Sequence, residues 1–228
     1  MEKAEKNKVR FGLVGRDISY SFSRGYFSEK FSILKLSQYS YENFDLQEID
    51  EFKKVIDTNE DIRGLNVTIP YKEAIIPYLD ELDSQAEKIG AVNTIKFTPK
   101  GLKGFNTDAY GFRNSIEPYL QRHHKKALIL GTGGASKAIA FVLDELGIDF
   151  SFVSRNPSKH QLSSTDLTED ILQENKIIIN CTPLGTHPDI EKKPAIPYQH
   201  IGSEHLLFDL IYNPDKTAFL KEGELRNA

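Results

Sequence analysis

An apolar strand, a glycine-rich turn and a helical pattern follow one another in the second half of the chain. Leu128-Ile-Leu130 leads into Gly131-Thr-Gly-Gly-Ala-Ser136, and apolar residues at helical spacing continue to Leu146. Glycines let the backbone approach a pyrophosphate, and a helix N-terminus supplies free N–H groups and positive potential. The order of elements therefore predicts a β-α-β unit with a dinucleotide phosphate loop, in which Ser136 replaces the third glycine of the strict pattern. The alternative is a tight turn without a ligand. The expected loop residues are Gly131, Thr132, Gly133, Gly134 and Ala135.

The rest of the chain alternates short strand patterns with helical ones. Strands are expected over 9–15, 39–46, 63–69, 91–97, 102–105, 127–130, 150–153, 177–180 and 206–211. Helices are expected over 24–36, 49–56, 72–89 (interrupted near Pro77), 108–120, 135–146, 165–173 and 219–225. Such alternation predicts α/β architecture with a mostly parallel sheet, and the turn Thr98-Pro-Lys-Gly101 predicts a hairpin that adds an antiparallel edge.

The polar stretch Gln121-Arg-His-His-Lys-Lys126 precedes a renewed β-α-β pattern, and we expect a domain boundary there. We predict a substrate domain over 1–110, a connecting helix and linker over 111–126, and a Rossmann-like nucleotide domain over 127–228. Two facing α/β lobes would form a cleft of the kind in which two-substrate enzymes carry out their chemistry.

Composition excludes several classes of protein. The net charge of −4 argues against a nucleic-acid surface, and no apolar run approaches the length of a membrane span. The N-terminus has no apolar signal-peptide core, and the single cysteine, Cys181, fits a reducing compartment. No spacing of His and Cys suggests a metal site. We therefore expect a soluble cytoplasmic protein without a metal.

The residues after the strand 150–153 discriminate between nucleotide cofactors. An NAD enzyme commonly has an acidic residue there, whereas this chain has Ser154-Arg155-Asn156 with Lys159 just beyond. A guanidinium can bind a 2′-phosphate through two hydrogen bonds, and a carboxylate would repel it. The pattern favours NADP over NAD; the alternative is a solvated surface arginine.

Polar side chains also gather at strand ends in the first half. Ser21 and Ser23 can hold one carboxylate, or they can cap the following helix. Asn66 and Thr68 alternate near a strand end and so share a face, which suits either a hydroxylated ligand or a structural role.

Lys72 and Asp108 form a pair suited to moving a proton, because an ammonium held by a carboxylate can polarise a carbonyl and protonate an alkoxide. The alternatives are a surface lysine at the start of a helix and an aspartate that caps the next helix. Together with Asn66, Thr68 and Asn93, the pair suggests a dehydrogenase that acts on a hydroxylated acid.

Taken together, these segments resemble the shikimate dehydrogenase family over nearly the whole chain. In the first half the matching patterns are Ser21-x-Ser23, Asn66-Val-Thr68-x-Pro-x-Lys72, Gly90-Ala-Val-Asn93-Thr94 and Asn106-Thr-Asp108. In the second half they are Gly131-x-Gly-Gly-Ala-Ser136, Ser154-Arg155, Asn180-x-Thr182 and Asp209-x-x-Tyr212-x-Pro214.

The resemblance implies NADPH-dependent, reversible reduction of 3-dehydroshikimate to shikimate in aromatic amino-acid biosynthesis. It implies that Ser21 and Ser23 hold the shikimate carboxylate, and that the ring hydroxyls are contacted by Asn66, Thr68, Asn93 and Asp108, with Tyr212 nearby. The pyrophosphate would lie on Gly131–Ala135, the 2′-phosphate would be surrounded by Ser154, Arg155, Asn156 and Lys159, and Leu210 would lie near the nicotinamide.

The chain departs from the family in two places. Ser154-Arg-Asn156 replaces the commoner Asn-Arg-Thr, which leaves more of the phosphate contact to Arg155 and Lys159. The sequence also stops at Asn227-Ala228, where family members continue into a final helix with a substrate-binding glutamine. From this we expect near-normal NADP binding, weakened shikimate binding, and a homodimer or a loosened pairing of the lobes.

Two alternative functions stay open at this stage. One is a quinate/shikimate dehydrogenase that uses NAD, and the other is a non-catalytic protein that binds NADP or shikimate.

Overall fold

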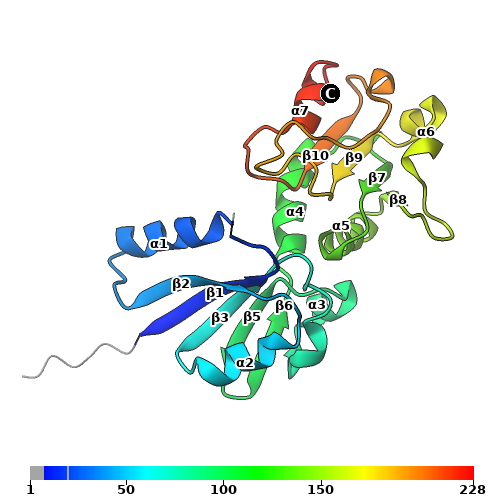
Figure 1. The fold of residues 1–228 in the computed structure, drawn as a ribbon. Helices are drawn as coiled ribbons and strands as arrows, with labels where there is room; N and C mark the ends of the chain where they lie inside the picture. Colours follow the sequence, from blue (N-terminus) through cyan, green and yellow to red (C-terminus); the bar gives the residue numbers. More distant parts are fainter. Residues whose placement is uncertain (1–7, 20) are drawn as a thin grey trace, which may run out of the picture. The chain divides into compact units, whose positions relative to one another are not determined.

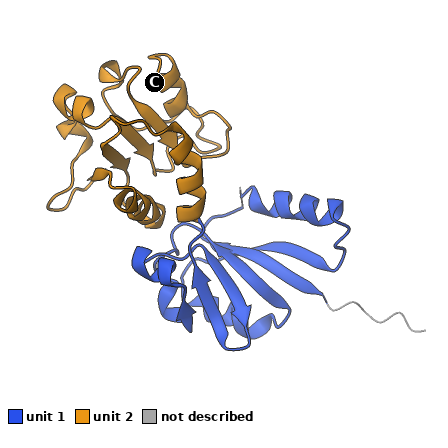
Figure 2. Cartoon of the chain, turned by 180° about the vertical axis from the view of Figure 1, so that it is seen from behind, with its two compact units in different colours: residues 1–107 blue, residues 108–228 orange. Residues whose placement is uncertain are grey.

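The computed structural model describes residues 8–19 and 21–228, which form two compact units, Met1–Thr107 and Asp108–Ala228 (Figures 1 and 2). Each unit is built around its own sheet. The fold class is therefore α/β, as the alternation of strands and helices predicted.

The sheet of unit 1 is mixed. Its strands lie in the order β2-β1-β3-β5-β6-β4, with bounds β1 Val9–Gly15, β2 Tyr39–Asp45, β3 Ile62–Val67, β4 Glu81–Leu82, β5 Thr94–Thr98 and β6 Gly101–Phe105. β2 and β3 run parallel to β1, β5 is antiparallel to β3 and to β6, and β4 runs parallel to β6. The reversed strand thus lies inside the sheet, not at the edge that we expected. The edge beyond the hairpin is formed by β4, whose two residues are too few to show a strand pattern in the sequence.

Helices of unit 1 are α1 (Ser23–Ile33), α2 (Glu51–Thr58), the 3₁₀ turn η1 (Ile76–Tyr78) and α3 (Ser84–Ile89). The helix expected over 72–89 is wrong for most of its length. Asp80 and Asp83 donate their backbone N–H groups to Leu102 and Gly104, at 2.9 and 2.8 Å, so this stretch bonds to β6 instead of to itself. The Asp83 side chain then accepts the N–H of Gln85 and begins α3 as its N-cap.

The two faces of this sheet are covered by different helices. On one face, Phe27 and Phe31 of α1 pack against Leu13 and Tyr41. On the other, Phe52 of α2 packs into a larger cluster that includes Val14, Leu65 and Val67. Because side chains alternate along a strand, burial of Leu65 and Val67 on the α2 face places Asn66 on the α1 face.

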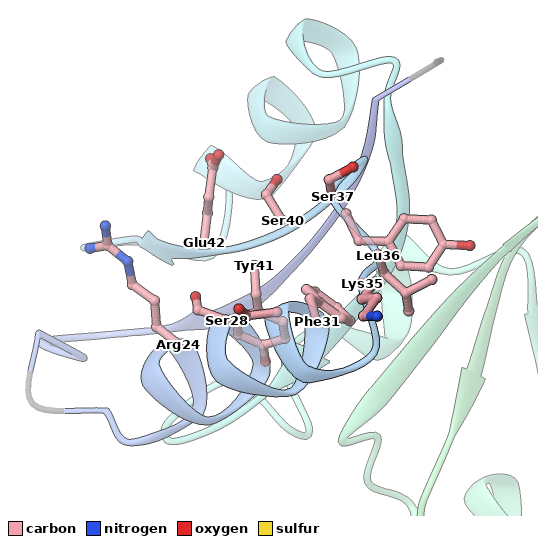
Figure 3. A pocket seen from close by; sticks show the side chains of 11 residues that line it. Arg24, Ser28, Phe31, Lys35, Leu36, Ser37, Ser40, Tyr41 and Glu42 are labelled. Carbon is pink, nitrogen blue, oxygen red and sulfur yellow. The ribbon is translucent and has the colours of Figure 1, made fainter.

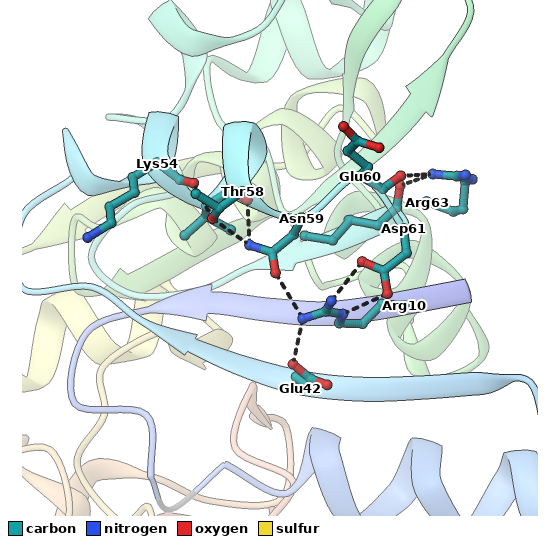
Figure 4. A network of polar contacts seen from close by, with 10 residues as sticks. Arg10, Glu42, Lys54, Thr58, Asn59, Glu60, Asp61 and Arg63 are labelled. Carbon is teal, nitrogen blue, oxygen red and sulfur yellow. Dashed lines mark hydrogen bonds and ion pairs between the residues drawn. The ribbon is translucent and has the colours of Figure 1, made fainter. Parts of the chain in front are cut away.

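Arg10 of β1 makes hydrogen bonds to polar side chains of β2 and of the segment that precedes β3 (Figure 4). Its guanidinium makes two hydrogen bonds to the Asp61 carboxylate, at 3.2 and 2.7 Å. Further hydrogen bonds reach Asn59 Oδ1 at 2.9 Å and Glu42 Oε2 at 3.2 Å. The guanidinium holds the pKa of the Asp61 carboxyl below its ordinary value, chiefly through their hydrogen bond. These contacts link β1 to β2 and to the segment that enters β3.

The sheet of unit 2 is wholly parallel. Its strands lie in the order β10-β9-β7-β8, with bounds β7 Lys126–Leu130, β8 Asp149–Val153, β9 Ile177–Asn180 and β10 Leu206–Asp209. All four residues of β9 are buried, as are Ala127–Leu130 of β7, which explains why both read as unbroken apolar runs. The helical elements are α4 (Asp108–Ile116), η2 (Glu117–Tyr119), α5 (Gly134–Glu145), η3 (Ser164–Asp166), α6 (Glu169–Glu174), η4 (Tyr198–His200) and α7 (Ala218–Glu224).

Candidate functional site

The loop after β1 carries the two serines expected to hold a carboxylate. Ser21 Oγ accepts the backbone N–H of Ser23, the first residue of α1, at 3.3 Å. The loop is also held by Asp45, whose carboxylate accepts the N–H groups of Asp17 and Ile18 at 2.8 and 3.2 Å. The N-cap of α1 is Phe22, without a side-chain cap hydrogen bond, so neither serine caps the helix, and both are half-buried.

Asn66 lies near the end of β3 and is bonded on two sides. Its Oδ1 accepts the hydroxyl of Tyr41 at 2.8 Å, and its Nδ2 donates to Thr94 Oγ1 at 3.3 Å. Thr68 follows directly after β3, where its N–H donates to the Val14 carbonyl at 2.9 Å. Asn66 is thus held by side chains, whereas Thr68 is placed by its backbone.

Lys72 lies in a turn, not at the start of a helix as we expected. The buried Tyr71 anchors that turn, because its hydroxyl donates to the Leu46 carbonyl at 2.8 Å. The carbonyl of Lys72 accepts the N–H of Val92 at 2.7 Å, which brings the lysine backbone beside the Gly90-Ala-Val-Asn-Thr94 segment. The expected conflict between this cation and a helix N-terminus does not arise.

Asn93 is buried, and it ties the approach to β5 to the end of unit 1. Its Oδ1 accepts the backbone N–H of Thr107 at 2.9 Å, and its Nδ2 donates to Thr107 Oγ1 at the same distance. Asn106 Nδ2 donates to the Ala91 carbonyl at 2.9 Å. The residue after Thr107, Asp108, is the first of α4 and of unit 2.

Three of the residues that complete this polar cluster were not singled out as site residues from the sequence. They are Tyr41, Thr94 and Thr107. Alternation along β2 gave a signal for Tyr41, since it predicts which residues of that strand face α1. No local pattern indicated that its hydroxyl reaches Asn66, a residue 25 positions away in sequence.

The glycine loop of unit 2 joins β7 to α5. Gly131 adopts φ +105°, a conformation that favours glycine, and a Cβ there would lie 3.3 Å from the Cys181 carbonyl oxygen. Gly133 is the N-cap of α5, and the helix begins at Gly134. A helix N-terminus preceded by exposed Thr132 and Gly133 fits the pyrophosphate of a dinucleotide.

Ser136 explains the departure from the strict three-glycine pattern. Its side chain is buried, and its Oγ donates to the Gly133 carbonyl at 2.6 Å. The hydroxyl is therefore used to hold the loop together, and it leaves the exposed N-terminus of α5 open to a ligand.

The segment after β8 carries the residues expected at a 2′-phosphate. Ser154 is half-buried, and its Oγ accepts the N–H of Asn156 at 3.2 Å. Arg155, Asn156 and Lys159 are exposed. Two exposed cations lie near a turn that the Ser154 hydroxyl holds, and such cations can bind a phosphate. The residues present therefore suit the 2′-phosphate of NADP.

The ends of β9 and β10 meet in a second polar network. Asn180 is fully buried and donates to Asp209 Oδ1 at 3.1 Å, and Thr217 donates to Asp209 Oδ2 at 2.7 Å. Burial raises the pKa of the Asp209 carboxyl, although these hydrogen bonds oppose the shift. Asp209 also accepts the N–H of Ile211 at 3.0 Å, and so shapes the segment that carries Leu210 and the exposed Tyr212.

A separate hollow of about 540 Å³ opens between α1 and β2 (Figure 3). Arg24, Phe31, Tyr41 and several serines line it, but it contains none of the residues predicted to bind substrate or cofactor. Within the described residues, no group of three His, Cys, Asp or Glu could hold a metal ion. No helix in residues 8–19 and 21–228 is long and apolar enough to cross a membrane.

The geometry defines a class of protein: a two-unit α/β protein that combines a Rossmann-like unit with a unit that carries a polar, hydrogen-bonded cluster. The family described as "Shikimate dehydrogenase substrate binding domain" matches residues 13–95. The shikimate dehydrogenase (NADP(+)) of Methanosphaera stadtmanae is 39% identical over 95% of this chain and 83% of its own length. The chain belongs to the shikimate dehydrogenase family.

Solved structures agree. Shikimate dehydrogenase 1 from Peptoclostridium difficile has a TM-score of 0.81 at 37% identity, over 95% of this chain and 82% of that one. The enzyme from Thermus thermophilus, solved with NADP(H) and shikimate, has a TM-score of 0.79 at 30% identity, over 96% and 84%. The resemblance inferred from short motifs is thereby confirmed, as is the expected pairing of a substrate domain with a Rossmann-like domain.

Proposed function

We propose that this chain catalyses the reversible, NADPH-dependent reduction of 3-dehydroshikimate to shikimate. The observation that carries the proposal is the bonded cluster of Asn66, Thr94 and Asn93 in a chain whose relatives are NADP-dependent shikimate dehydrogenases. A ligand with several hydroxyls needs several fixed polar groups, and this cluster supplies them near the end of β3 and the start of β5.

We assign substrate contacts to unit 1. Ser21 and Ser23 bind the carboxylate, while Asn66, Thr68 and Asn93 contact ring hydroxyls. Lys72 is half-buried, and a charge that is partly removed from water acts more strongly on a nearby carbonyl.

Lys72 and Asp108 are the proposed catalytic pair. NADPH supplies the hydride to the carbonyl carbon. Lys72 polarises the carbonyl oxygen and donates a proton to it as negative charge develops, and Asp108 holds and orients the ammonium. In the oxidative direction the lysine accepts the hydroxyl proton.

Cofactor contacts are assigned to unit 2. The backbone of residues 131–135 and the N-terminus of α5 bind the pyrophosphate. Arg155 and Lys159 bind the 2′-phosphate beside Ser154 and Asn156, and Leu210 contacts the nicotinamide. This assignment follows a domain division with substrate in the first unit and nucleotide in the second.

The decisive test measures turnover of purified protein with shikimate or quinate, each with NADP or NAD. We expect oxidation of shikimate with NADP and little reaction in the other three combinations. Comparable rates with quinate and NAD would favour a quinate/shikimate dehydrogenase. Binding of shikimate and NADP without turnover would favour a binding protein.

Two further properties belong to this proposal. The lone cysteine and the charge balance fit a cytoplasmic protein that binds neither nucleic acid nor membrane. A homodimer is the expected assembly, and light scattering after gel filtration would distinguish it from a monomer.

A further inference from the structure

Tyr41 of β2 is buried beneath α1 and aims its hydroxyl at Asn66. Its side chain is 4% exposed, and its ring stacks on Phe27 with centroids 4.5 Å apart and planes 11° from parallel. Its O–H donates to Asn66 Oδ1 at 2.8 Å. The stacking fixes the ring, and the ring in turn fixes where the hydroxyl lies.

The other side of the Asn66 amide is connected to the backbone through two side chains. Asn66 Nδ2 donates to Thr94 Oγ1 at 3.3 Å, and Thr94 Oγ1 donates to Asn93 Oδ1 at 3.1 Å. Asn93 Oδ1 also accepts the backbone N–H of Thr107 at 2.9 Å. A chain of hydrogen bonds thus runs from Tyr41 to the last residue of unit 1.

The Thr107 end of this series of hydrogen bonds determines which group donates in each of them. A backbone N–H can only donate, so the Asn93 atom that is bonded to the Thr107 N–H is the oxygen. The Thr94 hydroxyl directs its single proton to that oxygen and can therefore only accept from Asn66. The Asn66 nitrogen accordingly faces Thr94, and its oxygen faces Tyr41, which donates.

We propose that Tyr41 is a positioning residue that presents Asn66 to the substrate as a hydrogen-bond donor. With its oxygen bonded to Tyr41 and one amide hydrogen directed to Thr94, Asn66 offers its second Nδ2 hydrogen. The group that it suits is an oxygen acceptor on the substrate ring, a hydroxyl or a carbonyl. This inference rests on the proposed function, since it assumes that Asn66 contacts the substrate.

Tyr41→Phe tests the proposal with little disturbance of packing, because it removes the hydroxyl and keeps the ring on Phe27. We expect the KM for shikimate to rise about three- to ten-fold, the scale of one net hydrogen bond, while the KM for NADP stays unchanged. Tyr39→Phe is the matched control. Tyr39 lies on the same strand, two residues away, and its ring contacts Phe11 and Phe31. It should leave both KM values unchanged.

A double-mutant cycle decides whether Tyr41 acts through Asn66. In an Asn66→Ala background, Tyr41→Phe should have no further effect on the KM for shikimate. An equal rise in both backgrounds would overturn the proposal, and so would an unchanged KM in Tyr41→Phe alone. Asn66→Ser serves as the background if Asn66→Ala fails to fold.

Asn66→Asp separates donor from acceptor. A carboxylate of the same shape still accepts the Tyr41 hydroxyl but cannot donate to Thr94 or to substrate. Calorimetry should show shikimate affinity reduced at least as far as in Asn66→Ala, and affinity near that of the unchanged chain would overturn the donor role. If the unchanged chain neither binds nor oxidises shikimate, the proposed function falls and this inference with it. If the unchanged chain oxidises shikimate and Tyr41→Phe has the same KM for it, the inference about Tyr41 is overturned and the proposed function stands.

Discussion

The two units hold their candidate binding residues in different ways. In unit 1, Asn66 and Asn93 are bonded to other side chains before any ligand arrives. In unit 2, Arg155 and Lys159 are exposed, and neither side chain has a hydrogen bond or ion pair to another residue within 8–19 and 21–228. A fixed donor distinguishes one hydroxyl position from another. The conformational entropy of its side chain is lost when the protein folds, not when the ligand binds. An exposed cation binds phosphate over a range of geometries, and it is ordered only on binding, at about 0.5–1.5 kcal/mol per side chain.

The largest effect should come from the unit with fixed groups. Lys72→Met removes the ammonium that we propose as the proton donor to the substrate oxygen, and turnover should fall by about a hundred-fold or more. NADP affinity, measured by fluorescence titration, should not change. Lys88→Met on α3 removes an exposed cation from the same unit and serves as the control. Near-native turnover in Lys72→Met would assign the chemistry to another residue.

The exposed cations of unit 2 should give the next largest effect, and one confined to the cofactor. Arg155→Ala should weaken NADP by about ten- to a hundred-fold, because it removes a charge-assisted phosphate contact. NAD lacks the 2′-phosphate and should bind nearly as before. Arg122→Ala, an exposed arginine in the same unit, controls for the lost charge. Equal weakening of both nucleotides would show that Arg155 does not contact the 2′-phosphate.

Rigidity of unit 1 should also depend on contacts away from the site. Arg10→Met breaks the bonds to Asp61, Asn59 and Glu42, and partial exposure of the pair limits the expected loss of unfolding free energy to about 1–2 kcal/mol. Denaturant titration measures this loss, with Lys54→Met on α2 as the control. In Arg10→Met the KM for shikimate should rise more than the KM for NADP. No change in unfolding free energy would mean that the Arg10 contacts do not stabilise the sheet.

The smallest effect concerns pH and unit 2. His205 is 5% exposed; its Nδ1 accepts the Gly202 N–H at 3.1 Å and its Nε2 bonds to the Leu172 carbonyl at 3.0 Å. Burial lowers the pKa of His205 below its ordinary value of 6.5, and it does the same for His124. The unfolded chain therefore binds protons at a higher pH than the folded chain does. Stability should fall as the pH drops below 6.5, by at most about 1.4 kcal/mol per pH unit for each group.

His205→Gln keeps a donor to Leu172 and should flatten this dependence in thermal melts between about pH 7 and 5. His160→Gln, an exposed histidine, should leave the slope as it is. An unaltered slope in His205→Gln would assign the acid sensitivity to other groups, of which His124 is the first candidate because burial lowers its pKa as well.

Much of the fold could be predicted because the strands carry clear patterns. β1 and β9 have the expected bounds, since their buried apolar runs end at a glycine and an asparagine. The stretch 72–89 could not be predicted, because Asp80 and Asp83 bond to β6, which lies about 20 residues further along the chain. Short motifs indicated Asn66, Lys72, Asn93 and the glycine loop, whose roles stay predictions. The contacts of Tyr41 and Thr107 could not be predicted, because they depend on strand order, which no local sequence pattern indicates.

Thr107 offers a way to observe the polar cluster of Asn66, Thr94 and Asn93 directly. Its side chain is exposed and it lies beyond the end of β6, yet its N–H is bonded to the buried Asn93 side chain. Hydrogen exchange at this amide therefore requires the polar chain to open, while the sheet can remain intact. Its protection factor should rise when shikimate binds and should be lost in Asn93→Ala. One backbone amide would then report how readily the polar cluster opens.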